Sequence, residues 1–151
     1  MTVPEEKRLR ESDLDASPGE TWELLFKLSG LMRAHFEDVC AEFGLSAAQG
    51  RALLELDPGC PRPMRRLAER LGNDASNVTG IADRLEDRGL VERRPSEDDR
   101  RVKALAVTRD GEVLRERFVA RLKEAPSPIT RLAPEDRRAL RDILRSVVGD
   151  G

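Results

Sequence analysis

The sequence has few of the residues on which catalysis and metal binding usually depend: its 151 residues include one histidine, two cysteines and no tyrosine. His35 has Asp38 one helical turn away, but no nucleophile motif accompanies this pair. One histidine and two distant cysteines do not supply the ligands of a standard zinc site. Because a phosphate-binding loop and a carboxylate dyad are also missing, we expect neither an enzyme nor a bound cofactor or metal.

Long apolar segments are missing as well. No apolar run approaches the roughly 18 residues that span a bilayer, and residues 1–20 are polar and charged, without the apolar stretch of a signal peptide. Cys40 and Cys60 do not have the spacing of a metal pair or a disulfide framework. These absences predict a soluble, cytoplasmic protein that is not attached to a membrane.

Aromatic residues make up only 3% of the chain, whereas charged residues make up 37%. This composition favours extended helices with hydrated faces over a compact all-β core. The length suits one domain, or one domain with a dimerisation arm. The net charge is −2, yet residues 62–103 hold eleven Lys and Arg against nine Asp and Glu, a balance of +2. A dimer could therefore present a locally basic face while the whole chain stays weakly acidic.

Residues 1–19 are predicted to form a flexible N-terminal arm, and residues 20–43 a helix that Gly44 ends. Large apolar residues recur in this helix at alternating steps of three and four, with Ser29 the one polar residue in the row, which is typical of a narrow helix seam. They are Trp22, Leu25, Met32, Phe36, Val39 and Phe43.

The next segment begins with a helix start signal. Ser46 and Gln49 fit a capping box, in which the hydroxyl and the side-chain amide satisfy free amide groups. We expect this helix to run to about Asp57, where the proline-rich segment 58–63 breaks it. A short helix over residues 64–71 follows.

A tight turn from Gly72 to Asp74 leads into the next helix, 75–88, which Asp74 is expected to cap and Gly89 to end. A helix can enter the major groove of DNA only if one face is anchored and the other presents donors and acceptors. The inward residues of this helix are Val78, Ile81, Ala82 and Leu85, and the outer ones include Ser76, Asn77, Thr79 and Arg84. Arg84 could reach a phosphate or a guanine, or form a surface ion pair instead.

After Gly89 the pattern changes to short strands. Residues 90–94 and 102–107 are predicted to form a β-hairpin around the turn 95–100. Arginine at such a tip suits the narrow minor groove, and a hairpin whose charges only keep its edges soluble is the alternative. The position after a helix-turn-helix favours a DNA-binding wing, whose basic residues are Arg93, Arg94, Arg100, Arg101 and Lys103 against Glu97, Asp98 and Asp99.

The C-terminal part is predicted to be helical. Thr108 should cap a helix over residues 109–124, which Pro126 and Pro128 interrupt before a single turn restarts at Ser127. The last helix begins at Pro134, and its apolar stripe is Leu140, Ile143, Leu144 and Val147.

Several motifs in the middle of the chain resemble the multiple-antibiotic-resistance regulator (MarR) family. They are Leu67-Ala68-Glu69-Arg70-Leu71-Gly72, Ser76-Asn77-Val78-Thr79, the run from Asp83 to Arg93 and Asp99-Arg100-Arg101, followed by Thr108 and Gly111. Any one of them is weak, but together they are specific. The resemblance covers roughly residues 20–148 and implies a mainly α domain with a small β wing. Within it, residues 45–108 would form a winged helix-turn-helix and residues 20–43 and 109–148 a dimerisation arm.

The resemblance implies a homodimeric repressor that binds a pseudo-palindromic operator in double-stranded DNA. Such proteins release DNA when a small-molecule effector or an oxidant reaches the region between the arm and the reading head. Asp99 and Arg101 match the family's wing pair, in which the acid holds the arginine that enters the minor groove. Arg65, Arg66 and Arg84 would contact phosphates. The family's base-facing positions are occupied here by Ser76, Asn77, Thr79 and Gly80, the last of which is a longer side chain in many relatives.

Some residues have two interpretations. A candidate effector pocket is formed by Trp22, Met32, His35 and Phe36, although such residues at helical spacing are also typical of a dimer core. Cys60 near Arg62 could sense oxidants, but neither cysteine occupies the position of the family's reactive thiol, which favours inert thiols. A winged-helix module that binds a partner protein instead of DNA is the alternative function, suggested by the pI of about 5.6.

Overall fold

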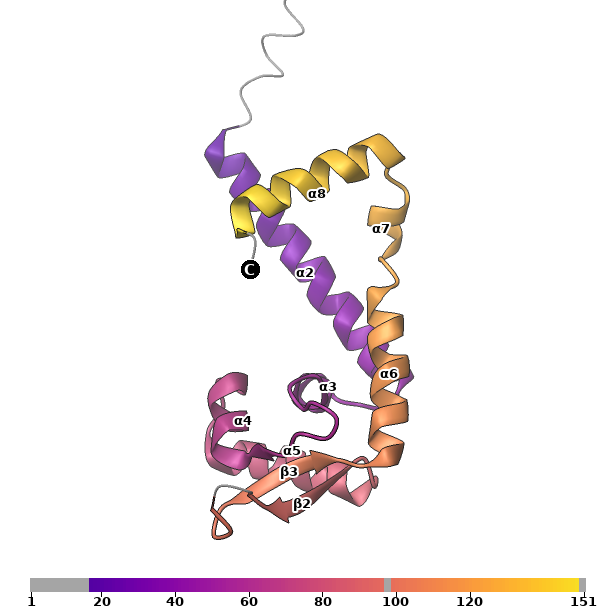
Figure 1. Cartoon of the computed structure of the whole chain (residues 1–151). Helices are drawn as coiled ribbons and strands as arrows, with labels where there is room; N and C mark the ends of the chain where they lie inside the picture. The colour runs from indigo at the N-terminus through magenta and orange to yellow at the C-terminus, as the bar shows by residue number, and fades with distance from the viewer. Residues whose placement is uncertain (1–16, 97–98, 150–151) are drawn as a thin grey trace, which may run out of the picture. The chain divides into compact units, whose positions relative to one another are not determined.

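The computed structural model describes residues 17–96 and 99–149. The elements run in the order α2 (Pro18–Glu42), α3 (Ala47–Leu54), β1 (Arg62–Pro63), α4 (Met64–Leu71), α5 (Ala75–Asp87), β2 (Val91–Pro95), β3 (Lys103–Val107), α6 (Arg109–Lys123), α7 (Ser127–Thr130) and α8 (Pro134–Val148) (Figure 1). The fold is mainly helical with a small sheet, as predicted. Residues 1–16 of the predicted N-terminal arm lie outside the described residues, and its last two residues belong to α2. None of the described helices combines the length and the apolar character needed to cross a membrane.

The chain divides into two compact units, Met1–Ala34 and His35–Gly151, and the boundary falls inside α2. In the first unit, α2 exposes large apolar side chains: Trp22 is 71% exposed, Phe26 70% and Met32 61%. None of the described residues of this unit is buried. The predicted seam is therefore uncovered over this stretch of the single chain.

The core of the second unit is built from α3, α4, α5, α6, the sheet and the last turns of α2. Phe118 of α6 is fully buried, and its ring meets those of Phe36 and Phe43 edge-on, with centroids 6.0 and 5.5 Å apart. Such edge contacts are a favoured arrangement of aromatic rings. They attach the end of α2 and the middle of α6 to one another.

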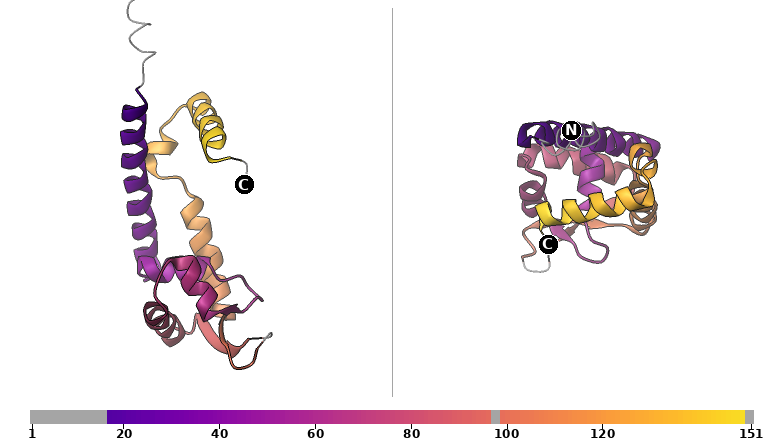
Figure 2. Two further views of the ribbon diagram at one scale, coloured as in Figure 1. Left: turned by 90° about the vertical axis from the view of Figure 1, so that its left-hand side faces the viewer. Right: turned by 90° about the horizontal axis from the view of Figure 1, so that it is seen from above.

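The sheet has three antiparallel strands in the order β1–β3–β2. β2 and β3 form the predicted hairpin, with Val91 opposite Val107, and Figure 2 shows this hairpin projecting from the helices α3, α4 and α5. The sequence analysis did not predict β1, in which Arg62 lies opposite Leu105. β1 is only two residues long and pairs with a strand far along the chain, so no local alternation of apolar residues marks it.

The start of α3 confirms the capping box, whereas its end corrects the prediction. The backbone amide of Ser46 donates to Gln49 Oε1 (2.8 Å), and the amide of Gln49 donates to Ser46 Oγ (3.2 Å). α3 ends at Leu54, before the predicted Asp57. Pro58 has no amide for the carbonyl oxygen of Leu54, so the helix cannot continue regularly past this point, and Arg115 of α6 donates to the free carbonyl oxygens of Leu53 and Leu54 instead.

The turns on either side of α5 depend on glycine. Gly72 and Gly89 have φ angles of 60° and 67°, in the left-handed region that glycine adopts without a steric penalty. Asp74 occupies the predicted N-cap position with an extended backbone, but its side chain makes no capping hydrogen bond. α5 ends at Asp87, and Arg88 is its C-cap residue.

The C-terminal helices follow the predicted interruptions. Thr108 caps α6 as expected, since its Oγ1 accepts the Gly111 amide at 3.1 Å. Pro126 lies between α6 and the single turn of α7, Pro128 lies within that turn, and α8 begins at Pro134. α8 exposes Ile143 (60%) and Val147 (72%), so part of its apolar stripe is uncovered in the single chain.

Candidate nucleic-acid interface

The predicted recognition helix, α5, has the two faces that its sequence pattern indicates. Its inward residues Val78, Ile81, Ala82 and Leu85 are buried against the core. All the predicted base-facing and phosphate-facing residues are exposed on the other side: Ser76, Asn77, Thr79, Gly80 and Arg84. Within the described part of the chain Arg84 forms no ion pair, so the alternative interpretation, a surface pair with a neighbouring carboxylate, is not seen there.

The two predicted phosphate contacts of α4 point into solvent. The side chains of Arg65 and Arg66 are 90% and 72% exposed, and both lie beside Glu69, at 3.2 and 3.0 Å. Exposed ion pairs of this kind contribute about 0–1 kcal/mol. Either guanidinium group can therefore exchange Glu69 for a phosphate at little cost.

The predicted DNA-contacting residues of the wing are exposed, but one implied contact is different. Asp99 Oδ1 accepts the backbone amide of Arg101 at 2.9 Å, rather than holding its guanidinium group. The carboxylate thus stabilises the turn, and Arg101 is exposed. Arg94 is ion-paired with Glu92 on the same strand. Arg94, Arg100, Arg101 and Lys103 are all exposed, and the tip residues 97–98 lie outside the described residues.

One hollow connects the helices and the wing. It has a volume of about 720 Å³ and is lined by Met64, Arg65, Ala68, Glu69, Asn73, Thr79, Arg93 and Lys103. The structure therefore brings together three predicted contacts from different elements: Arg65 of α4, Thr79 of α5 and Lys103 of β3. The other predicted contacts do not line this hollow.

Arg93 has a role that the sequence analysis missed. It was counted among the basic wing residues, but its side chain is only 21% exposed and pairs with Asp83 and Glu86 of α5. Its backbone amide also donates to Glu86 Oε1 at 3.1 Å. Burial opposes the charge, yet the hydrogen bonds and charges of Asp83 and Glu86 raise the pKa of Arg93 above its ordinary value. Arg93 thus joins the wing to the recognition helix, a contact ten residues apart that no helical or strand spacing predicts.

The comparison with known proteins agrees with this architecture. A model of the MarR family matches residues 43–102, from the end of α2 into the wing. The HTH-type transcriptional regulator YfiV of Bacillus subtilis is 31% identical over 138 residues, which cover 87% of this chain and 83% of that protein. The chain belongs to the MarR family.

Two further matches extend this result. The organic hydroperoxide resistance transcriptional regulator of Bacillus subtilis is 29% identical over 96 residues, covering 64% of this chain and 65% of that protein. CouR from Rhodococcus jostii RHA1, solved bound to p-coumaroyl-CoA, is 29% identical with a TM-score of 0.61, covering 85% of this chain and 91% of CouR. The chain is thus a MarR-family transcriptional regulator with the winged-helix fold of that family.

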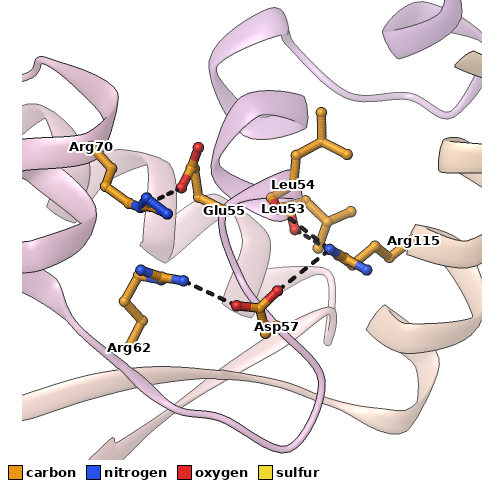
Figure 3. A network of polar contacts seen from close by, with 7 residues as sticks. All are labelled: Leu53, Leu54, Glu55, Asp57, Arg62, Arg70 and Arg115. Atoms are coloured by element: carbon orange, nitrogen blue, oxygen red, sulfur yellow. Dashed lines mark hydrogen bonds and ion pairs between the residues drawn. The ribbon is translucent and has the colours of Figure 1, made fainter. Parts of the chain in front are cut away.

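In this MarR-family chain a polar network joins α6 to the winged helix-turn-helix of residues 45–108, here called the reading head (Figure 3). Arg115 donates to the carbonyl oxygens of Leu53 (3.2 Å) and Leu54 (3.4 Å) at the end of α3, and its guanidinium lies 3.8 Å from Asp57. Asp57 in turn binds Arg62 of β1 at 3.1 Å. Side chains of opposite charge therefore link α6, the loop after α3 and the first strand.

The candidate effector residues are in different surroundings. Trp22 and Met32 are exposed in the first unit, whereas His35 and Phe36 are half-buried in the second. Phe36 packs against Phe118, and Nε2 of His35 is buried without a hydrogen-bond partner among the described residues. The joint pocket stays a prediction.

The two thiols differ in exposure. Cys40 is buried, and burial raises its pKa to about 11, so that it is protonated at neutral pH. A protonated, buried thiol is a poor nucleophile. Cys60 is exposed in the loop before β1. The alternative of oxidant sensing therefore depends on Cys60. Among the described residues, no group of three or more His, Cys, Asp or Glu side chains is arranged to hold a metal ion.

Proposed function

We propose that this regulator is a cytoplasmic homodimer that represses transcription by binding a pseudo-palindromic operator in double-stranded DNA. The observation that supports it best is the hollow where Arg65, Thr79 and Lys103 meet beside the exposed polar face of α5. An anchored helix with short polar residues outward suits the major groove, and flanking cations suit the phosphates on either side.

The contacts divide by chemistry. Ser76, Asn77 and Thr79 are short enough to meet base edges, while Gly80 allows the backbone to approach closely. Arg65, Arg66 and Arg84 would neutralise phosphates, and each neutralised phosphate releases counterions and makes affinity depend on salt. The wing residues Arg94, Arg100, Arg101 and Lys103 would follow the adjacent minor groove, where a narrow groove attracts arginine.

Dimerisation is supported by the uncovered apolar residues of α2 and α8. Trp22, Phe26, Ile143 and Val147 are each at least 60% exposed in the single chain. Burying them against a second copy would remove this apolar surface from water, at roughly 25 cal/mol per Å². Two reading heads would then contact two half-sites related by the same two-fold axis.

Release by a small organic effector is the regulatory part of the proposal. CouR, a relative of the same fold, was crystallised with p-coumaroyl-CoA. Trp22, Met32, His35 and Phe36 are the candidate effector contacts in this chain. A ligand that binds the DNA-free state more tightly than the DNA-bound state would lower operator affinity by that differential.

The test is selection from a pool of random duplexes, with affinity then followed against salt. We expect a pseudo-palindrome with half-sites about one helical turn apart and a steep loss of affinity as salt rises. The variant Arg101→Ala should bind the selected operator about tenfold or more weakly while remaining a dimer. Arg109→Ala is the matched control, because Arg109 is an equally exposed arginine, at the start of α6, that is not among the proposed DNA contacts.

Two results would count against this function. If Arg101→Ala binds the selected operator as tightly as the wild type at moderate salt, Arg101 does not contact the minor groove. No enriched sequence, or weak binding that ignores salt, would instead favour a winged helix that binds a partner protein.

A further inference from the structure

The helices α2 and α5 end in the same kind of turn, and both ends lie in the second unit. Each has a glycine in the left-handed region, Gly44 with φ 65° and Gly89 with φ 67°. In each, the amide of the following leucine returns to the carbonyl five residues earlier, at 2.8 Å in the α2 turn and 3.0 Å in the α5 turn. This pattern ends the helix sharply and leaves carbonyl groups directed outward from its last turn.

Arg88 joins these two helix ends. It is the C-cap residue of α5, and its guanidinium donates to the carbonyl oxygens of Gly44 (2.7 Å) and Phe43 (3.0 Å) in the turn after α2. The planar guanidinium fork makes both bonds at once, which fixes direction as well as distance. Its charge also lies at the carboxyl ends of two helices, where a cation is stabilised.

The turn that receives Arg88 is itself fastened to α6. Glu42 accepts two hydrogen bonds from Arg121 of α6, at 2.8 and 2.9 Å. The ring of Phe43 packs on Phe118 of α6. Arg88 therefore connects the recognition helix to the place where α2 and α6, two helices of the predicted dimerisation arm, meet.

We propose that Arg88 is a positioning residue that sets the angle of the recognition helix on the arm and thereby determines which half-site spacing the dimer accepts. This inference rests on the proposed function, since spacing has a meaning only for a dimer bound to two half-sites. Adding one base pair moves a half-site by about 3.4 Å along the duplex and rotates it about the duplex axis. If the Arg88 contact prevents the recognition helix from rotating on the arm, the dimer cannot bind such a site. If the helix can rotate freely, the dimer can bind it.

The experiment measures affinity for duplexes that share the selected half-sites but differ in separation, from two base pairs shorter to two base pairs longer. A duplex with one half-site is included. Spacing discrimination is the ratio of the affinity at the best separation to that one base pair away. We expect Arg88→Ala to reduce this ratio about tenfold, with affinity for the single half-site unchanged. Arg88→Lys, which keeps the charge but not the planar fork, should lie between it and the wild type, and Arg109→Ala should match the wild type.

A purely structural role predicts a different result. It would lower the unfolding midpoint and weaken binding by the same factor at every separation, leaving the ratio unchanged, and that result overturns the inference. If Arg88→Ala does not fold, Arg88→Lys decides, and a ratio equal to that of the wild type again overturns it. A wild-type protein that binds no duplex overturns the proposed function and this inference together. A sharp wild-type optimum that the Arg88 variants keep overturns this inference alone.

Discussion

Arginine side chains of this regulator have two distinct uses at the scale of single residues. Arg88, Arg93 and Arg115 each donate to two acceptors on another element of the chain. One guanidinium group has five N–H donors, so a single side chain can satisfy several carbonyl or carboxylate oxygens. Arg100 and Arg101 on the wing are exposed instead. The count of basic residues in a segment therefore does not say how many of them are available to DNA.

Gly111 allows a close approach between α6 and the residue before β2, and Gly111→Ala tests this contact. A Cβ atom at Gly111 would lie 1.9 Å from the carbonyl oxygen of Leu90 and 2.8 Å from Val107 Cγ1. Because a backbone oxygen cannot move aside, we expect this variant to lose roughly 1–3 kcal/mol of unfolding free energy. Gly80→Ala is the control, since nothing lies within 4 Å of its Cβ position, and it should gain about 0.5–1 kcal/mol from helix propensity. Urea denaturation at one protein concentration measures both, and equal midpoints would contradict the close approach at Gly111.

Elements are joined in this protein by polar contacts as well as by the apolar core. α6 meets α3 through the Arg115 network in Figure 3, and it meets the end of α2 through Arg121 and Phe118. Hydrogen bonds of a charged donor to the free carbonyls at a helix end do two things: they stabilise that end and define where the helix stops. Within the second unit, α3, α6 and the last turns of α2 are thereby held in a defined arrangement.

Arg115→Met tests this joint, because it keeps the aliphatic part of the side chain and removes the donors. The carbonyls of Leu53 and Leu54 lose their partner, and we expect a loss of about 1–3 kcal/mol in unfolding free energy. Hydrogen exchange should also become faster in the loop after α3. Arg109→Met, in the exposed first turn of the same helix, should change stability by less than about 0.5 kcal/mol. If the two variants unfold at the same urea concentration, the network does not stabilise the junction.

In the single chain, the helices α2 and α8 expose large apolar side chains to solvent. Trp22 and Phe26 on α2, and Ile143 and Val147 on α8, are the clearest examples. Exposed apolar patches of this kind are typical of protein–protein contacts, and in the proposed function the dimer buries them. A second copy of the chain is the partner that fits the proposed function.

Ile143→Glu tests the interface at the scale of the assembly. A charge placed in an apolar contact loses its hydration, so we expect dimer dissociation to become at least about tenfold easier. Sedimentation at several protein concentrations measures this, and operator binding should weaken in parallel. Arg145→Ala changes the net charge of α8 by the same amount from the opposite side of the helix, and it should leave the dimer intact. An unchanged sedimentation profile of Ile143→Glu would show that α8 lies outside the interface.

Local sequence patterns predicted the order of the elements apart from β1, the capping box at Ser46, the cap at Thr108, the glycine turns and the two faces of α5. These features depend on residues within one or two turns of each other, and local patterns record them. The folded structure was needed for the pairing of β1, for the backbone role of Asp99 in the wing turn and for the hydrogen-bond acceptors of Arg88, Arg93 and Arg115. Arg88 reaches a carbonyl 45 residues away and Arg115 one 62 residues away. An exposed arginine and one that joins two helices have the same local sequence signature, because what separates them is the distant acceptor that folding brings within hydrogen-bond distance.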